Sequence, residues 1–206
     1  MKNSAYTLVF AATLGAVCAI VLAVPSEMLE PYRRANMEAD KVRTILGVLG
    51  VPVEKKASSQ QLLDSFRSVV KEERRGTLSL YRYLRDEETV AVAVPFSGPG
   101  VWGPVEGFLS LSPDLRTVRG ITFHKHEETP GLGGEIASER FRKQFIGKTL
   151  ESISGKAGIR IRPPNSPLAD NEVHAITGAT MTCNKVEAML TAVIQRIKEE
   201  QNENVK

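Results

Sequence analysis

The sequence predicts an α+β protein, in which one N-terminal transmembrane helix is followed by a single domain with an antiparallel sheet flanked by helices. Three observations favour this class. Residues 5–24 are apolar and carry no charge, four β-like runs follow one another through short turns, and helical patterns lie on both sides of those runs. A length of 206 residues is sufficient for an anchor and one domain with its own core.

The apolar segment is long enough to cross a membrane. Twenty residues in a helix extend about 30 Å, which is the thickness of a bilayer's hydrocarbon core. A cleaved signal peptide is the alternative, but its apolar core is usually shorter, and Ala23-Val24-Pro25 is a poor cleavage site. We therefore predict an uncleaved anchor over residues 1–26. Charge leaves the side of the membrane open, because long domains cross largely regardless of nearby charges.

The rest of the chain divides into three parts. We predict a helical segment at 27–75 that packs on the domain, a main domain at 76–200 and a disordered polar tail at 201–206. Ser58 or Ser59 is expected to cap the second helix of the helical segment, and Gly76 is expected to end it.

The main domain is expected to contain a meandering antiparallel sheet, because its β-like runs are joined by short turns. These runs cover residues 77–84, 89–96, 105–111 and 117–124. Asp86-Glu87 and Pro113-Asp114 are typical turn sequences. Further helices are predicted at 138–146 and 184–198, the second with one continuous apolar stripe.

Composition argues against several classes of function. The net charge is only +3, and no basic stripe with interleaved aromatic residues is present, so nucleic-acid binding is not expected. The two cysteines, Cys18 and Cys183, do not form a disulfide framework. His124, His126 and His174 lack the spacing of metal ligands, so no metal site is predicted.

Three stretches of small residues are candidates for chemistry. Two are glycine-rich loops at 97–104 and 127–134, and the third is the run His-Ala-Ile-Thr-Gly-Ala-Thr-Met-Thr at 174–182, directly before the last helix. Hydroxyls and free N–H groups at a helix start favour a bound phosphate, although an ordinary helix cap is the simpler interpretation. Tight turns likewise explain the two loops. Neither loop matches a nucleotide-hydrolase or dinucleotide-binding glycine motif.

Taken together, these stretches resemble the FMN-binding domain family. Residues 128–135, Glu-Thr-Pro-Gly-Leu-Gly-Gly-Glu, look like the signature loop of that family, and Thr-Gly-Ala-Thr-Met-Thr at 177–182 resembles its flavinylation motif. The stretch at 100–107 is similar to its glycine/tryptophan segment. With the anchor, the pattern resembles the flavin-carrying NqrC family of sodium-translocating NADH:quinone reductase subunits, or the related RnfG family of ferredoxin:NAD oxidoreductases.

The resemblance implies an FMN joined through its phosphate to the hydroxyl of Thr180, installed by a flavin transferase with FAD as donor. It also implies a set of residues around the cofactor. These are Thr177, Gly178, Ala179, Met181, Thr182, Lys185, Glu128, Thr129, Gly131, Leu132, Gly133 and Trp102. The apolar members are expected at the ring, and Glu128 and Thr129 at its polar edge. One position departs from the family pattern, because His174 stands where the motif has an aspartate.

The function implied is that of a membrane-anchored electron carrier within an ion-translocating NADH:quinone reductase complex, with no catalytic residues of its own. Its partners would be other subunits of the complex, and its domain would lie outside the bacterial inner membrane. The Trp-Gly-Pro stretch and the double glycine after Leu132 favour the NqrC family, whereas the short chain favours the RnfG family. From another class, a non-redox membrane-tethered binding or scaffolding domain remains the alternative. A free-standing flavin reductase would need a nicotinamide motif, which we do not find.

Overall fold

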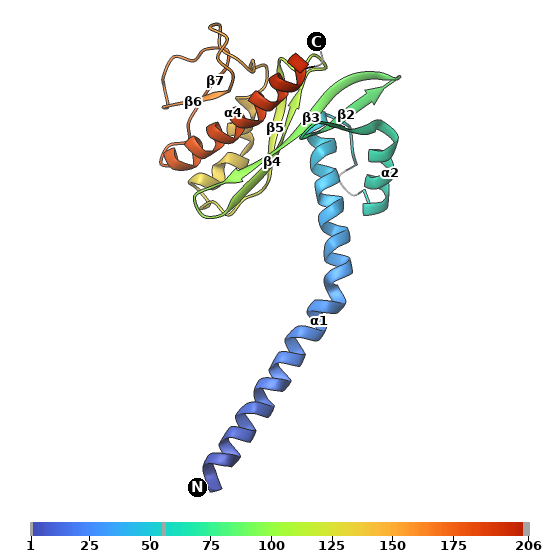
Figure 1. Ribbon diagram of the computed structural model, residues 1–206, viewed down its shortest axis with the longest axis vertical. Coiled ribbons are helices and arrows are strands. Elements are labelled where there is room, and N and C mark those ends of the chain that lie inside the picture. Colours follow the sequence, from blue (N-terminus) through green and yellow to red (C-terminus); the bar gives the residue numbers. More distant parts are fainter. Residues whose placement is uncertain (1, 55–56, 204–206) are drawn as a thin grey trace. The chain divides into compact units, whose positions relative to one another are not determined.

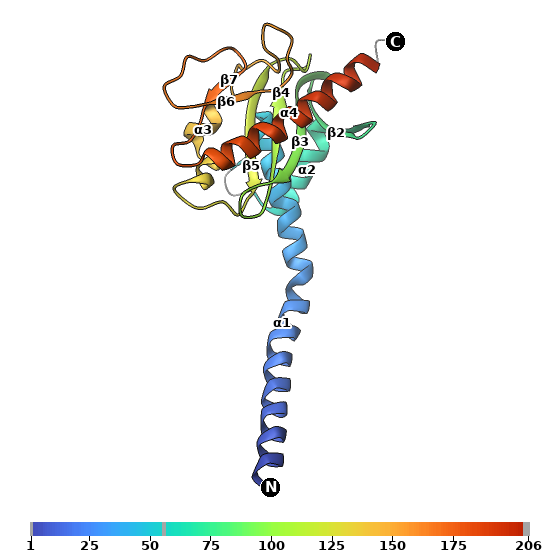
Figure 2. The same cartoon turned by 60° about the vertical axis from the view of Figure 1, so that its left-hand side comes forward.

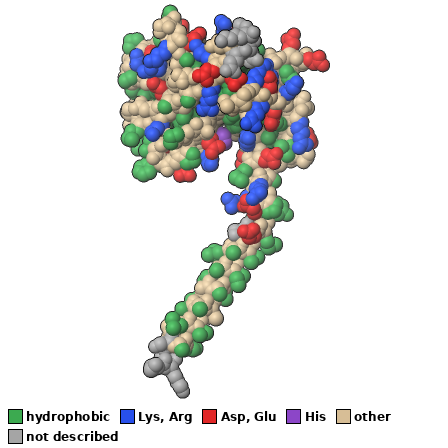
Figure 3. Space-filling model, viewed as in Figure 1, with side chains coloured by type: hydrophobic (Ala, Val, Ile, Leu, Met, Phe, Trp, Pro, Cys, Tyr) green, Lys and Arg blue, Asp and Glu red, His purple; other side chains and the backbone are tan. Residues whose placement is uncertain are grey.

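The computed structural model describes residues 2–54 and 57–203, and the chain divides into two compact units, Met1–Asp40 and Lys41–Lys206. Helix α1 (Lys2–Leu49) runs through the boundary between them. In the first unit its apolar side chains are exposed (Figure 3), and by length and composition this helix can cross a membrane. The helix predicted from residue 30 is therefore not a separate element but the continuation of α1.

The second unit is built on a five-stranded sheet. Its strands are β1 (Val70–Arg75), β2 (Leu78–Arg85), β3 (Glu88–Pro99), β4 (Pro104–Leu111) and β5 (Val118–Lys125). Each strand pairs antiparallel with its neighbour in sequence, which confirms the predicted meander (Figure 1). Asp86 and Glu87 have φ angles of 51° and 67°, as required in the two-residue turn that joins β2 to β3.

Strand β1 corrects the prediction of a helical segment that extends to residue 75. Helix α2 (Ser59–Val69) begins with a capping box in which the Ser58 side chain accepts from the N–H of Gln61, and it ends at Val69. Residues 70–75 are strand, because after Val70 they are all charged and offer no apolar stripe to a helix. Gly76, interpreted as a helix stop, lies in the β1–β2 turn with a φ of 50°.

Helices cover both faces of the sheet (Figures 1 and 2). Helix α4 (Thr180–Glu203) lies across one face and buries the apolar stripe predicted for the last helix, including Val186, Leu190 and Ile194. On the other face, Phe66 of α2 contacts Tyr81 of β2, with ring centroids 6.1 Å apart. The end of α1 beyond residue 40 contributes further buried side chains to this second layer, Val42, Ile45, Leu46 and Leu49.

The connection between β5 and α4 is less regular. It contains the 3₁₀ helix η1 (Gly133–Ala137), the short helix α3 (Glu139–Lys143), and strands β6 (Arg160–Arg162) and β7 (Glu172–His174), which pair in parallel. The predicted helix at 138–146 is thus shorter than expected. Strands β6 and β7 were missed because three-residue strands carry no readable alternation.

Helix α4 is longer than predicted at both ends. It begins at Thr180 rather than near residue 184, so the threonine-rich stretch enters its first turn. It also continues to Glu203, which corrects the disorder predicted for residues 201–203, whereas 204–206 lie outside the described residues.

Candidate functional site

A single buried carboxylate joins the three small-residue stretches singled out in the sequence. Glu128, in the second glycine-rich loop, is only 5% exposed. One carboxylate oxygen accepts hydrogen bonds from the main-chain N–H groups of Val101 (2.7 Å) and Trp102 (3.4 Å) in the first loop. The other accepts from the hydroxyl of Thr182 at 2.6 Å, at the start of α4. The two glycine-rich loops and the helix start therefore form one site.

The charge of Glu128 is stabilised by these donors. Burial alone would raise the pKa of the carboxyl group, but the hydrogen bonds from Thr182, Val101 and Trp102, together with nearby His126, lower it below its ordinary value. The carboxylate is thus ionised at neutral pH. Its two oxygens are already engaged by protein donors, so the structure gives Glu128 a bracing role in addition to the predicted place at the edge of a cofactor.

The two loops approach the Glu128 carboxylate so closely that glycine is required at the points of contact. We call Glu128 and its three hydrogen-bond donors the brace. A Cβ on Gly133 would lie 2.5 Å from the Thr182 hydroxyl oxygen and 2.6 Å from a Glu128 oxygen. A Cβ on Gly100 would lie 2.4 Å from the other Glu128 oxygen. All three contacts are shorter than real carbon–oxygen contacts. Glycine at these positions therefore lets the loops close on the carboxylate.

The threonines do not cap helix α4. The first helical hydrogen bond runs from the N–H of Cys183 to the carbonyl of Ala179 at 3.0 Å, so Ala179 is the N-cap residue, and it has no side-chain acceptor. Thr182 instead donates to Glu128. The N–H groups of the first turn are left without an intrahelical partner, and such groups attract an anion. This arrangement disfavours the ordinary cap as the interpretation of the stretch.

Thr180 is the first residue of the helix and is exposed. Within the part of the chain that the structure describes, its hydroxyl has no hydrogen-bond partner. Thr182, by contrast, is buried and its hydroxyl is engaged. Of these two hydroxyls, that of Thr180 is therefore free for chemistry. Thr177, Gly178 and Lys185 are exposed on the same end of the helix, and Ala179 is buried.

Three large apolar side chains around this helix end remain exposed: Trp102 (71%), Met181 (67%) and Leu132 (45%). Leu132 lies against Gly178, since its Cδ2 atom would be 3.1 Å from a Cβ added to that glycine. Thr129 shapes the loop, since its carbonyl accepts from the N–H groups of Leu132 (3.1 Å) and Gly134 (2.9 Å). Gly131 supplies a φ of 76° within the same turn. The exposed apolar surface is the kind that a planar ring covers.

A cavity of about 470 Å³ flanks the stretch on the side of α3. Its lining includes His174 and Gln144. The side-chain amide of Gln144 accepts from the His174 N–H at 2.9 Å and donates to the His174 carbonyl at 3.4 Å, as a neighbouring strand would. Sequence reasoning missed Gln144, because nothing in the sequence links residues that are 30 positions apart.

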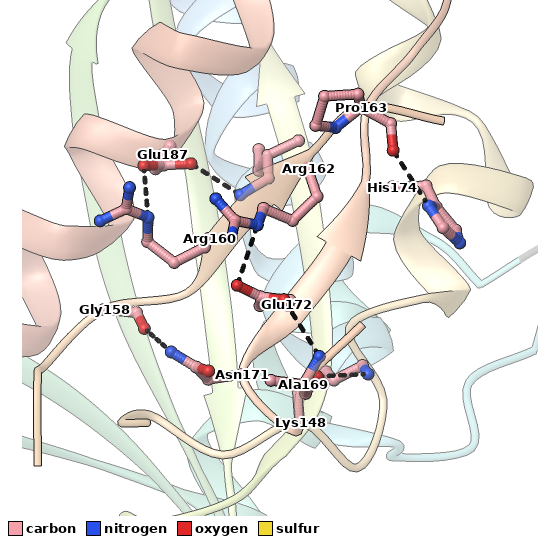
Figure 4. A network of polar contacts seen from close by, with 11 residues as sticks. Lys148, Gly158, Arg160, Arg162, Pro163, Ala169, Asn171, Glu172, His174 and Glu187 are labelled. Atoms are coloured by element: carbon pink, nitrogen blue, oxygen red, sulfur yellow. Dashed lines mark hydrogen bonds and ion pairs between the residues drawn. The ribbon is translucent and has the colours of Figure 1, made fainter. Parts of the chain in front are cut away.

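A polar network fixes the segment that leads into the stretch (Figure 4). Glu187 of α4 accepts from the N–H of Ile161 (2.6 Å) and pairs with Arg160 (3.0 Å). Arg162 in turn pairs with Glu172 at 3.0 Å. The imidazole of His174 lies 3.5 Å from the Pro163 carbonyl. Strands β6 and β7 are therefore fastened to the helix that begins at Thr180.

Comparison with known proteins agrees with this geometry. Residues 100–195 match the FMN-binding domain family. The chain is 30% identical to the NqrC subunit of the Na⁺-translocating NADH-quinone reductase of Pasteurella multocida, over 87% of this chain and 85% of that protein. It is 34% identical to the same subunit from Pseudomonas aeruginosa, over 62% of this chain and 49% of that protein.

Solved structures show the same fold. The crystal structure of the NqrC subunit of the Na⁺-translocating NADH-quinone reductase from Parabacteroides distasonis has a TM-score of 0.67 and 25% identity, and the match covers 80% of this chain and 92% of that chain. Shewanella oneidensis NqrC has a TM-score of 0.65 at 20% identity and covers 76% and 91%, respectively, which shows the fold alone.

The fold and the three converging stretches define a protein with an FMN-binding domain and an N-terminal apolar helix. The chain belongs to the NqrC family, one of the subunit families of the Na⁺-translocating NADH-quinone reductases. The resemblance stated from the sequence is confirmed.

Proposed function

We propose that this chain is a membrane-anchored electron carrier of a Na⁺-translocating NADH:quinone reductase complex, with an FMN attached through its phosphate to Thr180. One observation carries the attachment: the exposed hydroxyl of Thr180 has no hydrogen-bond partner among the described residues and stands at the start of an uncapped helix. The family match supplies the cofactor, and the names of the relatives supply the complex.

The residues present fit the group. A phosphate on Thr180 would face the unpaired N–H groups of the first turn of α4, where the helix dipole also favours negative charge. Lys185, exposed in the next turn, adds a positive charge on the same helix end. Trp102, Leu132 and Met181 offer the apolar surface that the ring system needs.

Bound FMN would supply the redox chemistry, and the protein's own residues would set its position. Glu128 holds the loop of Trp102 and the loop of Leu132 against the helix start, through Val101 and Thr182. The attachment itself would form an Oγ–P bond on Thr180 and break the P–O–P bond of FAD, with AMP as the leaving group and loss of the hydroxyl proton. A separate flavin transferase would catalyse this step.

The same proposal places the chain in a membrane. Helix α1 provides the apolar helix for a single crossing. The domain would lie on the extracytoplasmic side, as the resemblance to the FMN-binding domain family implies. Because the chain belongs to the NqrC family, we propose a complex of the Nqr type rather than of the Rnf type. A non-redox tether would not require the free hydroxyl at the helix start.

In-gel fluorescence tests the attachment. After co-expression with a flavin transferase, the denatured wild-type band is expected to fluoresce under ultraviolet light, and the Thr180→Ala band is expected to be dark. Thr177→Ala is the matched control, since Thr177 is also exposed and lies in the same stretch. A dark wild-type band contradicts covalent attachment. A fluorescent Thr180→Ala band with a dark Thr177→Ala band assigns it to the other hydroxyl.

A further inference from the structure

The outermost strand of the sheet is open to a partner. Strand β1 is at the end of the sheet order, and within residues 2–54 and 57–203 no strand pairs with its outer side. It is six residues long and contains neither proline nor glycine. Its outward main-chain N–H and C=O groups therefore form a regular edge to which an extended segment of another chain can add.

One face of the β1–β2 pair carries three cations and a single carboxylate. The register places Lys71 directly opposite Arg82, and Glu73 and Arg75 share that face because alternate residues of a strand point the same way. Glu73 binds Arg75 at 2.6 Å through one oxygen and Arg82 at 2.5 Å through the other. The only carboxylate on this face is thus fully engaged by two guanidinium groups.

This arrangement leaves an excess of positive charge on this face, because one carboxylate is shared by two guanidinium groups and Lys71 lies beside them. Two like charges directly opposite one another destabilise a strand pair. Arg82 is also 19% exposed, so its charge is largely withdrawn from water. Glu200 of α4 lies at the Gly76 turn, beyond the end of the β1–β2 strand pair. Even if its negative charge is added to that of Glu73, the three cations leave this face of the strand pair with a net positive charge. An exposed lysine alone would protect the edge from aggregation.

We propose that β1 is a docking strand for an acidic, extended segment of a partner subunit. The segment would add to the free edge by main-chain hydrogen bonds, and its carboxylates would relieve the repulsion between Lys71 and Arg82. Figure 3 shows Lys and Arg side chains over this end of the domain, interspersed with acidic ones. The proposal rests on the proposed place of the chain in a multi-subunit complex and not on a flavin at Thr180.

Two single charge reversals test it. Lys71→Glu places a carboxylate opposite Arg82, which favours the strand pair, so this variant is expected to fold at least as stably as wild type. Arg74→Glu is the matched control, since Arg74 is exposed on the same strand but on its other face. The complex is purified through a tag on another subunit and washed with increasing sodium chloride, and retention of this chain is measured.

Lys71→Glu is expected to reduce retention at least tenfold and Arg74→Glu less than twofold. A photo-crosslinker at the exposed Glu72 is expected to join an acidic segment of a partner subunit. Equal retention of the two variants overturns the docking strand, as does a crosslink to lipid or to a segment without acidic residues. If the wild-type chain itself does not co-purify, the proposed place in the complex fails, and the docking strand fails with it.

Discussion

Removal of the Glu128 carboxylate is the sharpest test of the brace. Glu128→Ala leaves two donors, the part-buried Val101 N–H and the buried Thr182 hydroxyl, without their acceptor. Each such loss costs about 1–3 kcal/mol. The third donor, the Trp102 N–H, is at 3.4 Å and adds little. We expect Glu128→Ala to lower the free energy of unfolding by about 3 kcal/mol, since water can reach part of the space left behind.

Glu128→Gln is expected to cost only about 1 kcal/mol at neutral pH, because the amide oxygen still accepts from Val101 and the amide N–H₂ can donate to the Thr182 hydroxyl. The difference from wild type depends on pH. The folded pKa of Glu128 is lowered, so its ionised form stabilises the fold above the ordinary pKa of about 4.3, and this stabilisation is lost as the pH falls through the lowered value.

The assay is urea unfolding of the detergent-solubilised full-length protein, followed by far-ultraviolet circular dichroism between pH 3 and 7. A Thr180→Ala background keeps flavin content from varying among the samples. The gap between wild type and Glu128→Gln is expected to be widest above about pH 5.5 and to narrow below about pH 4.3. A gap independent of pH, or Gln as costly as Ala, refutes the bracing role.

Three further changes probe the surroundings of the brace. Gly133→Ala forces a Cβ to 2.5 Å from a buried oxygen and should cost about 1–3 kcal/mol in chemical unfolding, whereas Gly134→Ala, whose nearest atom is 3.1 Å away, should cost less. Gln144→Ala removes both hydrogen bonds between the Gln144 side chain and the His174 main chain. We expect the free energy of unfolding to fall by about 1 kcal/mol, because the adjoining cavity admits water. An unchanged unfolding midpoint would show that these two hydrogen bonds do not stabilise the fold. Trp102→Ala should change stability by less than about 0.5 kcal/mol, since the side chain is exposed, while it weakens the visible circular dichroism of an attached flavin.

Much of the fold could be predicted, because local patterns carry it. The α+β class, the antiparallel order of the sheet and the Asp86-Glu87 turn follow from alternation and turn chemistry that lie within a few residues. Strand β1 was missed because its charges hide any alternation, and Gly76 serves equally well as a helix stop and as a hairpin turn. The start of α4 was placed late because threonines are weak helix formers.

The candidate site likewise has features that lie in contiguous motifs and features that depend on contacts between distant residues. Thr180, Leu132 and Trp102 could be proposed as site residues because each lies in a motif that is contiguous in the sequence. The brace around Glu128 could not be predicted from the sequence, because the hydrogen bond from Thr182 to Glu128 joins residues 54 positions apart. Loop glycines such as Gly133 signal close approach in general, but only the folded chain shows that they close on a carboxylate.

Mass spectrometry of the full-length protein, purified after co-expression with a flavin transferase, tests the central claim most directly. The intact mass is expected to exceed that of the unmodified chain by one FMN less one water, and fragmentation is expected to place the added group on Thr180. The Thr180→Ala protein should have its unmodified mass. An unmodified wild-type mass, or a flavin phosphate located on another residue, would contradict the account.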